Sequence, residues 1–137
     1  MRIKLFIFIV FMAYFSYSCE DKRDDSGKLG GMWQMASWID SSETCHPTYG
    51  LYYIFRKNLV QFQDVKNSSY YYIAYYKRTN DSLFIYHIVN YPNDELCSPI
   101  QLQKFGIPDN GMFKIEKLTN DNLILSCDNA TITFRKQ

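Results

Sequence analysis

Cysteine and histidine are the residue types in this 137-residue chain that could ligate a metal or act as nucleophiles. Their spacing argues against both uses. Cys45 and His46 are adjacent, which is not a geometrically useful pair of ligands, and C-x-x-C and H-x-x-x-H motifs do not occur. The second histidine, His87, shares a face with Leu83 and Ile85; if that face is inward, its ring could hydrogen-bond a ligand or a core tyrosine. We expect no metal site.

The serines, carboxylates and glycines also lack the arrangements that catalysis needs. We find no Ser-His-Asp set, no glycine-rich phosphate loop and no pair of acids with the spacing of a glycosidase. Asp64 shares a face with Val60 and Phe62, so it could point inward and meet a cation or a ligand hydroxyl, or it could end a strand in water. We therefore expect neither enzymatic activity nor a cofactor.

Aromatic residues are the most suggestive feature that remains, because the chain contains 12 Tyr and 10 Phe. A phenol ring combines an apolar wall with a hydrogen-bonding tip, which suits a small apolar or aromatic ligand. The same side chains could instead fill a core and cover an interaction surface. The candidate ligand-binding residues are Tyr53, Phe55, Phe62, Tyr72, Tyr76 and His87.

Alternating apolar and polar residues predict that these side chains are positioned by β-strands. The period of two is clearest near the end of the chain, where Phe113 and Ile115 alternate with Lys114 and Glu116. Turn-forming residues such as Asn, Asp and Ser separate the strands. Eight strands joined by hairpins favour one all-β domain over residues 29–137, an antiparallel up-and-down β-barrel without exposed edges. The predicted strands are 32–39, 50–56, 59–65, 70–78, 82–90, 112–118, 122–127 and 130–136.

Loop lengths then indicate which end of the barrel is open. One end would carry the tight turns 57–58, 79–81 and 119–121, and the other the long loops 40–49 and 91–111. Long loops usually mark the functional rim, so the ligand site is predicted there.

The cysteines of those loops suggest a covalent link across the rim. Cys45 and Cys97 fall in the two longest loops, and in an oxidising compartment we expect them to form a disulfide. Cys127 would be a buried thiol or the alternative partner of one of them.

The N-terminus carries a delivery signal. Arg2 and Lys4 precede an apolar run of 11 residues, Leu5–Phe15, which is typical of a signal peptide and too short to span a membrane. Cleavage before Cys19 fits either ordinary secretion or a lipoprotein, and residues 1–18 resemble a bacterial lipoprotein signal. Lipidated Cys19 would then attach the chain to a membrane through the acidic and polar tether 19–28.

Cleavage of the signal peptide also changes the charge of the chain. The 15 basic residues include Arg2 and Lys4, so the mature chain keeps 13 against 14 acidic residues, a net charge of −1. We therefore expect no nucleic-acid partner, because such proteins carry a basic footprint.

Gly31-Met32-Trp33 matches the G-x-W of a first lipocalin strand, and residues 113–125 and 132–136 are similar to closing lipocalin hairpins. The chain thus resembles a bacterial lipocalin-like lipoprotein over about residues 29–137. The resemblance implies that Gly31 and Trp33 are structural and that a terminal basic residue, Arg135 or Lys136, packs across the tryptophan.

These features together predict a lipid-anchored protein of the Gram-negative cell envelope, in the outer membrane, with a small hydrophobic or aromatic ligand at its open end. The alternative is a filled barrel that acts as an inhibitor or interaction module for an envelope protein partner.

Overall fold

The computed structural model describes residues 27–67, 71–128 and 130–137. The signal peptide 1–18, Cys19 and most of the tether 19–28 lie outside the described residues.

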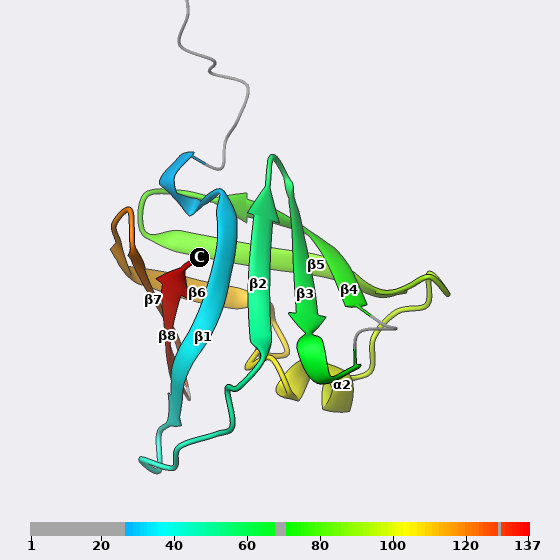
Figure 1. The fold of residues 1–137 in the computed structure, drawn as a ribbon, viewed down its shortest axis with the longest axis horizontal. Coiled ribbons are helices and arrows are strands. Elements are labelled where there is room, and N and C mark those ends of the chain that lie inside the picture. Colours follow the sequence, from blue (N-terminus) through cyan, green and yellow to red (C-terminus); the bar gives the residue numbers. More distant parts are fainter. Residues whose placement is uncertain (1–26, 68–70, 129) are drawn as a thin grey trace, which may run out of the picture.

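Eight antiparallel strands form one closed ring in chain order (Figure 1). Strand β1 pairs with both β2 and β8, which closes the barrel. Every observed strand bound agrees with the predicted one to within one residue. The prediction of an all-β, eight-stranded antiparallel barrel is therefore confirmed. The strands are β1 (Gly31–Asp40), β2 (Leu51–Arg56), β3 (Leu59–Asp64), β4 (Tyr71–Arg78), β5 (Ser82–Tyr91), β6 (Met112–Leu118), β7 (Asn122–Cys127) and β8 (Ala130–Lys136).

The two ends of the barrel differ in their connections. We call one end the tether end; it carries the short helix η1 (Gly27–Leu29) and the three tight turns, at the top of Figure 1. We call the other end the mouth; it carries the β1–β2 loop, the short helix η2 (Val65–Asn67) and the long β5–β6 loop with helix α2 (Pro99–Gln103). The prediction that the long loops share one end thus agrees with the topology.

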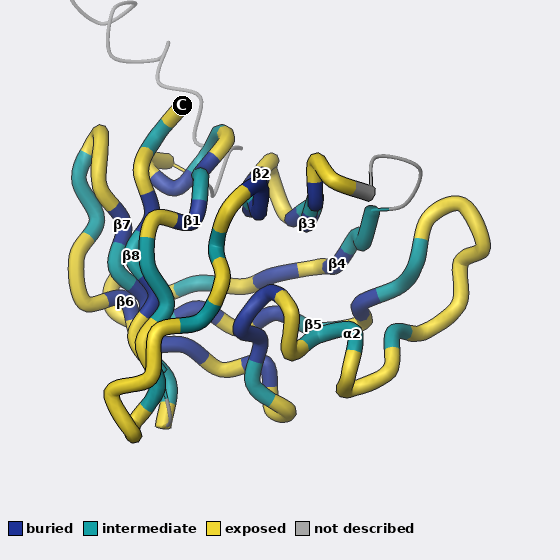
Figure 2. Tube along the Cα trace, turned by 60° about the horizontal axis from the view of Figure 1, so that its bottom comes forward, coloured by how far each residue is buried: buried dark blue, intermediate teal, exposed yellow. Residues whose placement is uncertain are grey.

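Every strand contains buried residues (Figure 2). Trp33, Tyr53, Phe62 and Phe134 are fully buried. The ring centre of Tyr53 lies 4.6 Å from that of Phe62 and 4.7 Å from that of Phe134. These rings pack against one another inside the barrel, so its interior is occupied by the protein's own side chains.

Three β-bulges change which residues face inward. The pairing of β1 with β8 skips Ala36, and the pairing of β6 with β7 skips Glu116. In β5, both His87 and Ile88 lie opposite a single residue of β4. An extra residue reverses inside and outside from that point onward. Trp38 consequently packs against the core, although simple alternation from Trp33 and Met35 would place it outside.

The Trp33 indole closes the tether end. Its Nε1 donates a hydrogen bond of 2.8 Å to the carbonyl of Leu29, which is itself fully buried. The ammonium of Lys136 lies 4.5 Å from the centre of the Trp33 ring and donates to the Gly30 carbonyl. Of the two basic residues that the resemblance suggested, Lys136 therefore lies across the tryptophan and Arg135 does not. Alternation along β8 leaves Arg135 exposed and directs Lys136 over the ring.

Gly31 begins β1 in a conformation that favours glycine. Its φ is +121°, a region that residues with a side chain rarely adopt. A Cβ atom at this position would also lie 2.7 Å from Cε of Lys136. Glycine therefore allows the chain to turn from η1 into β1 while the lysine covers Trp33.

Candidate functional site

The β5–β6 loop covers the mouth of the barrel. Phe105 follows α2 in this loop and is only 2% exposed; its ring centre lies 5.6 Å from that of Phe62 and 5.5 Å from that of Tyr72. The hydroxyl of Tyr53 donates a hydrogen bond of 2.5 Å to the Phe105 carbonyl. The sequence suggests that this loop is part of an open rim. In the structure it instead inserts Phe105 into the mouth as an aromatic plug, which a hydrogen bond from Tyr53 connects to the core.

Local sequence explains why the loop folds back at this point. Ser98 caps α2, because its side chain accepts from the Gln101 N–H while the Gln101 side chain accepts from the Ser98 N–H. Pro99 occupies the first turn, where a missing N–H costs nothing. Gly106 has φ +71°, and a Cβ atom there would lie 2.6 Å from Cδ1 of Ile132. The segment after α2 therefore lies directly against the core.

A cleft of about 430 Å³ remains at the mouth, between this loop and strands β3 to β5. Phe62, Tyr72 and Phe105 form its aromatic side, and amides such as Asn90 and Gln101 contribute polar groups. Small-molecule sites occupy about 300–1,000 Å³, so this cleft has a suitable size. Its aromatic side suits an apolar group, and the rest of its lining is polar. Two of the predicted ligand-binding residues, Phe62 and Tyr72, lie here.

An ion pair between buried Asp64 and partly exposed Lys104 lies in the cleft. Asp64 is 6% exposed, and its carboxylate contacts the ammonium of Lys104 and accepts a hydrogen bond of 2.9 Å from the Lys66 N–H. Burial acts to raise the pKa of Asp64, but the hydrogen bonds from Lys104 and Lys66 and the positive charge of Lys104 outweigh it, so the pKa is lowered. The sequence left open whether Asp64 meets a cation, a ligand hydroxyl or water. In the structure Lys104 of the β5–β6 loop supplies a cation, and the carboxylate stays ionised.

Tyr72 offers a hydrogen-bond donor to the same cleft. Burial raises the pKa of its phenol, and the nearby Cys97 and Asp64 raise it further, so the hydroxyl is protonated at neutral pH. No described residue accepts a hydrogen bond from it. A partly buried donor without a protein acceptor can bond a ligand at low desolvation cost.

Three other predicted ligand-binding residues lie in the packed interior. Tyr53 and Phe55 are fully buried in the core. Tyr76 lies near the tether end, where its hydroxyl donates to the Arg56 carbonyl at 2.8 Å and to the Lys57 carbonyl at 2.7 Å. The structure therefore does not bring these three side chains to the cleft at the mouth.

The placement of His87 toward a ligand is wrong. The β5 bulge gives His87 a φ of +53° and turns its side chain to the outer surface, where the ring stacks near Tyr75 at 6.1 Å. Ile88 takes the inward position instead. The three-residue spacing between Ile85 and Ile88, in place of two, is the sequence signal that could have revealed the bulge.

The predicted disulfide between Cys45 and Cys97 is also wrong, because both thiols and that of Cys127 are free. Cys45 pairs with Ile39 beside β1, whereas the Cys97 N–H donates to the Ile88 carbonyl of β5. Strands β1 and β5 lie on opposite sides of the eight-stranded ring, which holds the two thiols apart. Burial raises the pKa of Cys97 to about 11.

His46 organises the β1–β2 loop. Asp40 accepts hydrogen bonds from the Ser42 and Thr44 N–H groups and contacts the His46 ring nitrogen at 2.9 Å. The bonds from His46 and Thr44 lower the pKa of Asp40. The His46 ring also stacks on Trp38 with 4.1 Å between centroids. These contacts give the histidine a structural role at the mouth.

Comparison with known proteins places this barrel in a family. A model of the lipocalin-like domain matches residues 11–137. The chain belongs to the lipocalin-like domain family. No curated protein matches the chain.

Solved structures resemble this lipocalin-like domain in fold. A lipocalin-like protein from Bacteroides uniformis matches with a TM-score of 0.65 and 22% identity, over 81% of this chain and 100% of that one. A protein from Bacteroides eggerthii matches with a TM-score of 0.61 and 24% identity, over 79% and 98% of the two chains. The structure of a protein from Burkholderia xenovorans gives a TM-score of 0.53 and 12% identity, over 82% and 86%.

The plug and ion pair of this lipocalin-like domain were not predicted from the sequence. Phe105-Gly106-Ile107 is an apolar run inside a long polar loop, and that run is the signal that the loop packs inward. Nothing in the sequence pairs Lys104 with Asp64. Within the described ranges, no three His, Cys, Asp or Glu side chains are grouped to hold a metal ion, and no helix is long and apolar enough to cross a membrane.

Proposed function

We propose that this protein is a lipid-anchored component of the bacterial cell envelope that binds a small aromatic or amphipathic molecule in the cleft at the mouth of its barrel. The observation that carries the proposal is the cleft itself, with an aromatic side formed by Phe62, Tyr72 and Phe105. The filled interior excludes a ligand along the barrel axis, so the ligand would lie between the strands and the β5–β6 loop.

The chemistry of the cleft supports an aromatic ligand with a hydrogen-bonding group. The rings of Tyr72 and Phe105 meet edge to face, with 5.5 Å between centroids, and leave apolar surface for stacking. The Tyr72 hydroxyl and the amides of Asn90 and Gln101 provide polar contacts around it. Lys104 is 42% exposed, so it can also approach an acidic group of the ligand while Asp64 holds its ammonium.

Titration with 8-anilinonaphthalene-1-sulfonate, an aromatic anion, tests this proposal by fluorescence. We expect saturable binding that the Tyr72→Ala substitution weakens by about 5- to 100-fold, because a ring contact and a hydrogen bond are together worth about 1–3 kcal/mol. Tyr75→Ala is the matched control, since Tyr75 lies on the same strand and on the outer surface. Equal binding by both variants, or no saturable binding to the folded protein, would contradict a site in the cleft.

Anchoring through Cys19 is the second part of the proposal and has its own test. The basic start, the short apolar run and the cysteine at the first mature position support it. Labelled palmitate should enter the wild-type chain expressed in a Gram-negative host, and Cys19→Ala should abolish the label. Unlabelled wild type would show that the chain is secreted without an anchor.

An interaction module for an envelope protein is the second candidate function. It is favoured by an exposed apolar band on the outer surface of β3 to β6, in which neighbouring strands place Leu59 beside Tyr75, Tyr75 beside Tyr86, and Phe84 beside Met112. A photo-reactive phenylalanine analogue at position 84 should then cross-link to a partner in cells. The same analogue at position 66, in η2 at the mouth, should not.

A further inference from the structure

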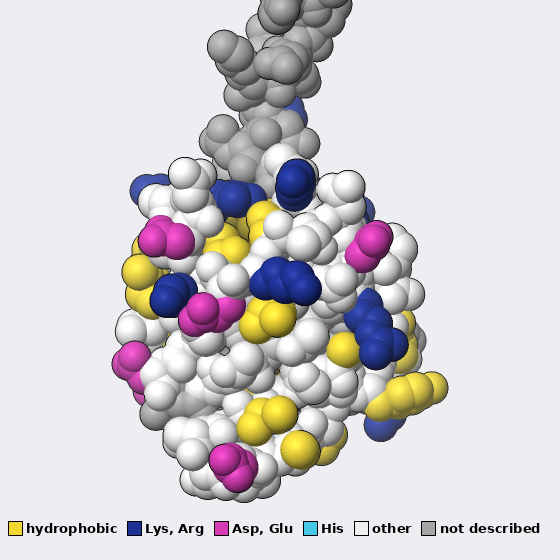
Figure 3. All heavy atoms as spheres, turned by 90° about the vertical axis from the view of Figure 1, so that its left-hand side faces the viewer, with side chains coloured by type: hydrophobic (Ala, Val, Ile, Leu, Met, Phe, Trp, Pro, Cys, Tyr) yellow, Lys and Arg dark blue, Asp and Glu magenta, His cyan; other side chains and the backbone are white. Residues whose placement is uncertain are grey.

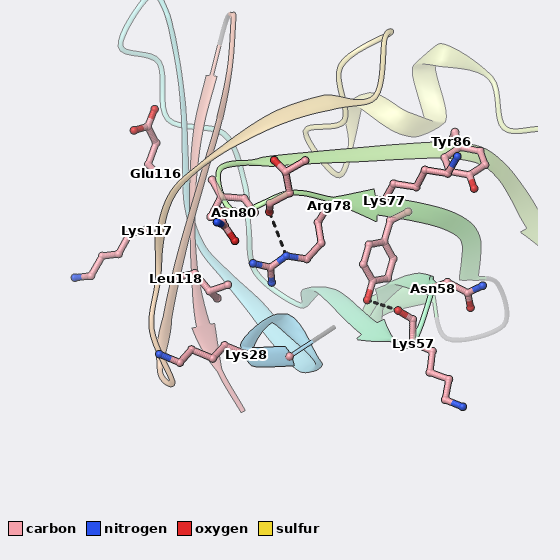
Figure 4. Close-up of a pocket in the computed structure, with 14 residues that line it drawn as sticks. Lys28, Lys57, Asn58, Lys77, Arg78, Asn80, Tyr86, Glu116, Lys117 and Leu118 are labelled. Atoms are coloured by element: carbon pink, nitrogen blue, oxygen red, sulfur yellow. Dashed lines mark hydrogen bonds between the residues drawn. The ribbon is translucent and has the colours of Figure 1, made fainter. Parts of the chain in front are cut away.

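A second, larger cavity lies at the tether end, opposite the mouth. It has a volume of about 1,050 Å³ and is formed by η1, the β2–β3 and β4–β5 turns and the end of β6. The lining is strongly basic, and its cations are Lys28, Lys57, Lys77, Arg78 and Lys117. Figure 4 shows Lys57 and Lys117 extending on opposite sides of this pocket, with Arg78 between them.

The positive charge of the pocket is largely uncompensated. Among the described residues, Lys28, Lys57, Lys77 and Lys117 form no ion pair. The single carboxylate of the lining is Glu116, and it accepts a hydrogen bond of 2.7 Å from Ser126 and pairs with Lys114 at 3.7 Å. Like charges held around a concave surface raise the local concentration of anions.

Charge is also divided between the two ends of the barrel. Arg56, Arg135 and Lys136 add further basic groups at the tether end. Of the ten carboxylates in the described residues, Asp81, Glu116 and Asp121 lie toward the tether end. The other seven lie at the mouth, on its loops and the adjoining strand ends: Asp40, Glu43, Asp64, Asp94, Glu95, Asp109 and Asp128. Figure 3 shows one face, on which Lys and Arg side chains lie mainly toward the tether end. Positive charge is therefore concentrated at one end of the folded domain and negative charge at the other, even though the net charge is small.

The position of the basic end relative to the chain identifies its partner. The described chain starts at Gly27 beside the pocket, only eight residues after Cys19. Eight residues span at most about 28 Å when fully extended, so an anchored barrel could not move its tether end far from the bilayer. The partner that this geometry presents to the pocket is the phosphate-bearing surface of the membrane.

We propose that the basic pocket at the tether end binds the headgroups of anionic phospholipids, so that the barrel rests on its membrane with the mouth pointing away. This inference rests on the proposed envelope location, but the pocket can be examined without the anchor. Each Lys or Arg near an anionic bilayer contributes about 1 kcal/mol, which is about five-fold in affinity. The contributions weaken with salt, because the Debye length is about 10 Å at 0.1 M ionic strength.

Vesicle flotation tests the inference with the mature chain from residue 19 carrying Cys19→Ala, which keeps the acidic tether and the complete barrel. We expect binding to vesicles of phosphatidylglycerol and phosphatidylcholine at 0.05 M salt, and none to phosphatidylcholine alone. The double variant K57Q/K117Q should bind about 25-fold more weakly, and the single variant K117Q about five-fold more weakly. K66Q, which removes one positive charge from η2 at the mouth, should bind like the unmodified pocket.

The outcomes separate this inference from the proposed function. Equal binding to both kinds of vesicle, equal losses in K117Q and K66Q, or no binding at low salt would overturn the lipid-binding pocket, whatever the palmitate label and the dye titration show. Binding of inorganic pyrophosphate at the same lysines, without binding to phosphatidylglycerol vesicles, would assign the pocket to a soluble phosphate and would also overturn it. Thermal unfolding of each variant verifies that the barrel is intact.

Discussion

Replacing Tyr53 by phenylalanine removes one oxygen atom from the core and releases the plug at the mouth. The Tyr53 hydroxyl is the only described group that donates to the Phe105 carbonyl, and both residues are buried. A buried carbonyl that loses its partner costs about 1–3 kcal/mol, so we expect Y53F to lower the free energy of unfolding by this amount. For a domain of this size the melting temperature should fall by about 5–15 °C.

Two measurements check the prediction. Urea unfolding gives the free energy of unfolding, and amide hydrogen exchange gives the local effect. Y53F should increase the exchange rate of residues 102–107 more than that of the β2–β3 hairpin. Tyr52→Phe is the matched control, because Tyr52 neighbours Tyr53 in β2 and makes no hydrogen bond through its hydroxyl with the described residues. If Y53F and Y52F differ by less than about 0.5 kcal/mol, or the loop exchanges equally in both, the hydroxyl does not hold the plug.

The dependence of the free energy of unfolding on alkaline pH offers an independent check on the role of Tyr53. Burial raises the pKa of Tyr53 well above its ordinary value. The folded state therefore keeps the proton that the unfolded state releases, and stability present below about pH 10 is lost as the pH rises further. Y53F should flatten this dependence, and an unchanged dependence would indicate that Tyr53 ionises freely in the fold.

Three further predictions concern backbone, thiols and acid stability. Gly111→Ala should lower the free energy of unfolding by more than about 3 kcal/mol, because Gly111 has φ +67° and a Cβ atom there would lie 2.0 Å from the Ile85 carbonyl oxygen. Gly27→Ala should cost only about 1 kcal/mol, because Gly27 has φ +50° but open space around it. Urea unfolding of the two variants compares them. Iodoacetamide at pH 8 should label exposed Cys45 well before Cys97, because the pKa of about 11 keeps the partly buried Cys97 thiol protonated. Equal labelling rates of the two cysteines by mass spectrometry would contradict the partial burial of Cys97. Asp64→Asn should lower stability at pH 7. The difference from wild type should begin to shrink as the pH falls below about 3.8 and should disappear only below the lowered pKa of the folded state, because a lowered folded pKa gives stability that is lost as the pH falls through it; parallel pH curves would rule out this linkage.

The strands and turns of this barrel could be predicted because they depend on neighbouring residues. The alternation of apolar and polar side chains marks each strand, and short polar segments mark each turn, so the strand bounds needed no knowledge of distant contacts. The match of Gly31 and Trp33 to the first lipocalin strand likewise depends on local sequence. The division into a tether end and a mouth followed from loop lengths alone.

The candidate site depended on contacts between distant parts of the chain, and there the prediction from sequence fails. A bulge at His87 turned a predicted ligand contact to the outer surface. The spacing of Ile85 and Ile88 hints at this bulge, but the bulge itself is fixed only by pairing with β4.

Length, alternation and turn residues by themselves determined an eight-stranded barrel with a short tether, because each of these properties is local. Only the tertiary structure decided that Phe105 plugs the mouth, that Lys104 pairs with Asp64, and that basic side chains from η1, the β2–β3 turn, the end of β4 and β6 line one pocket. The reason is physical: barrel closure brings together residues far apart in sequence, and their burial and charge interactions exist only once the ring is closed.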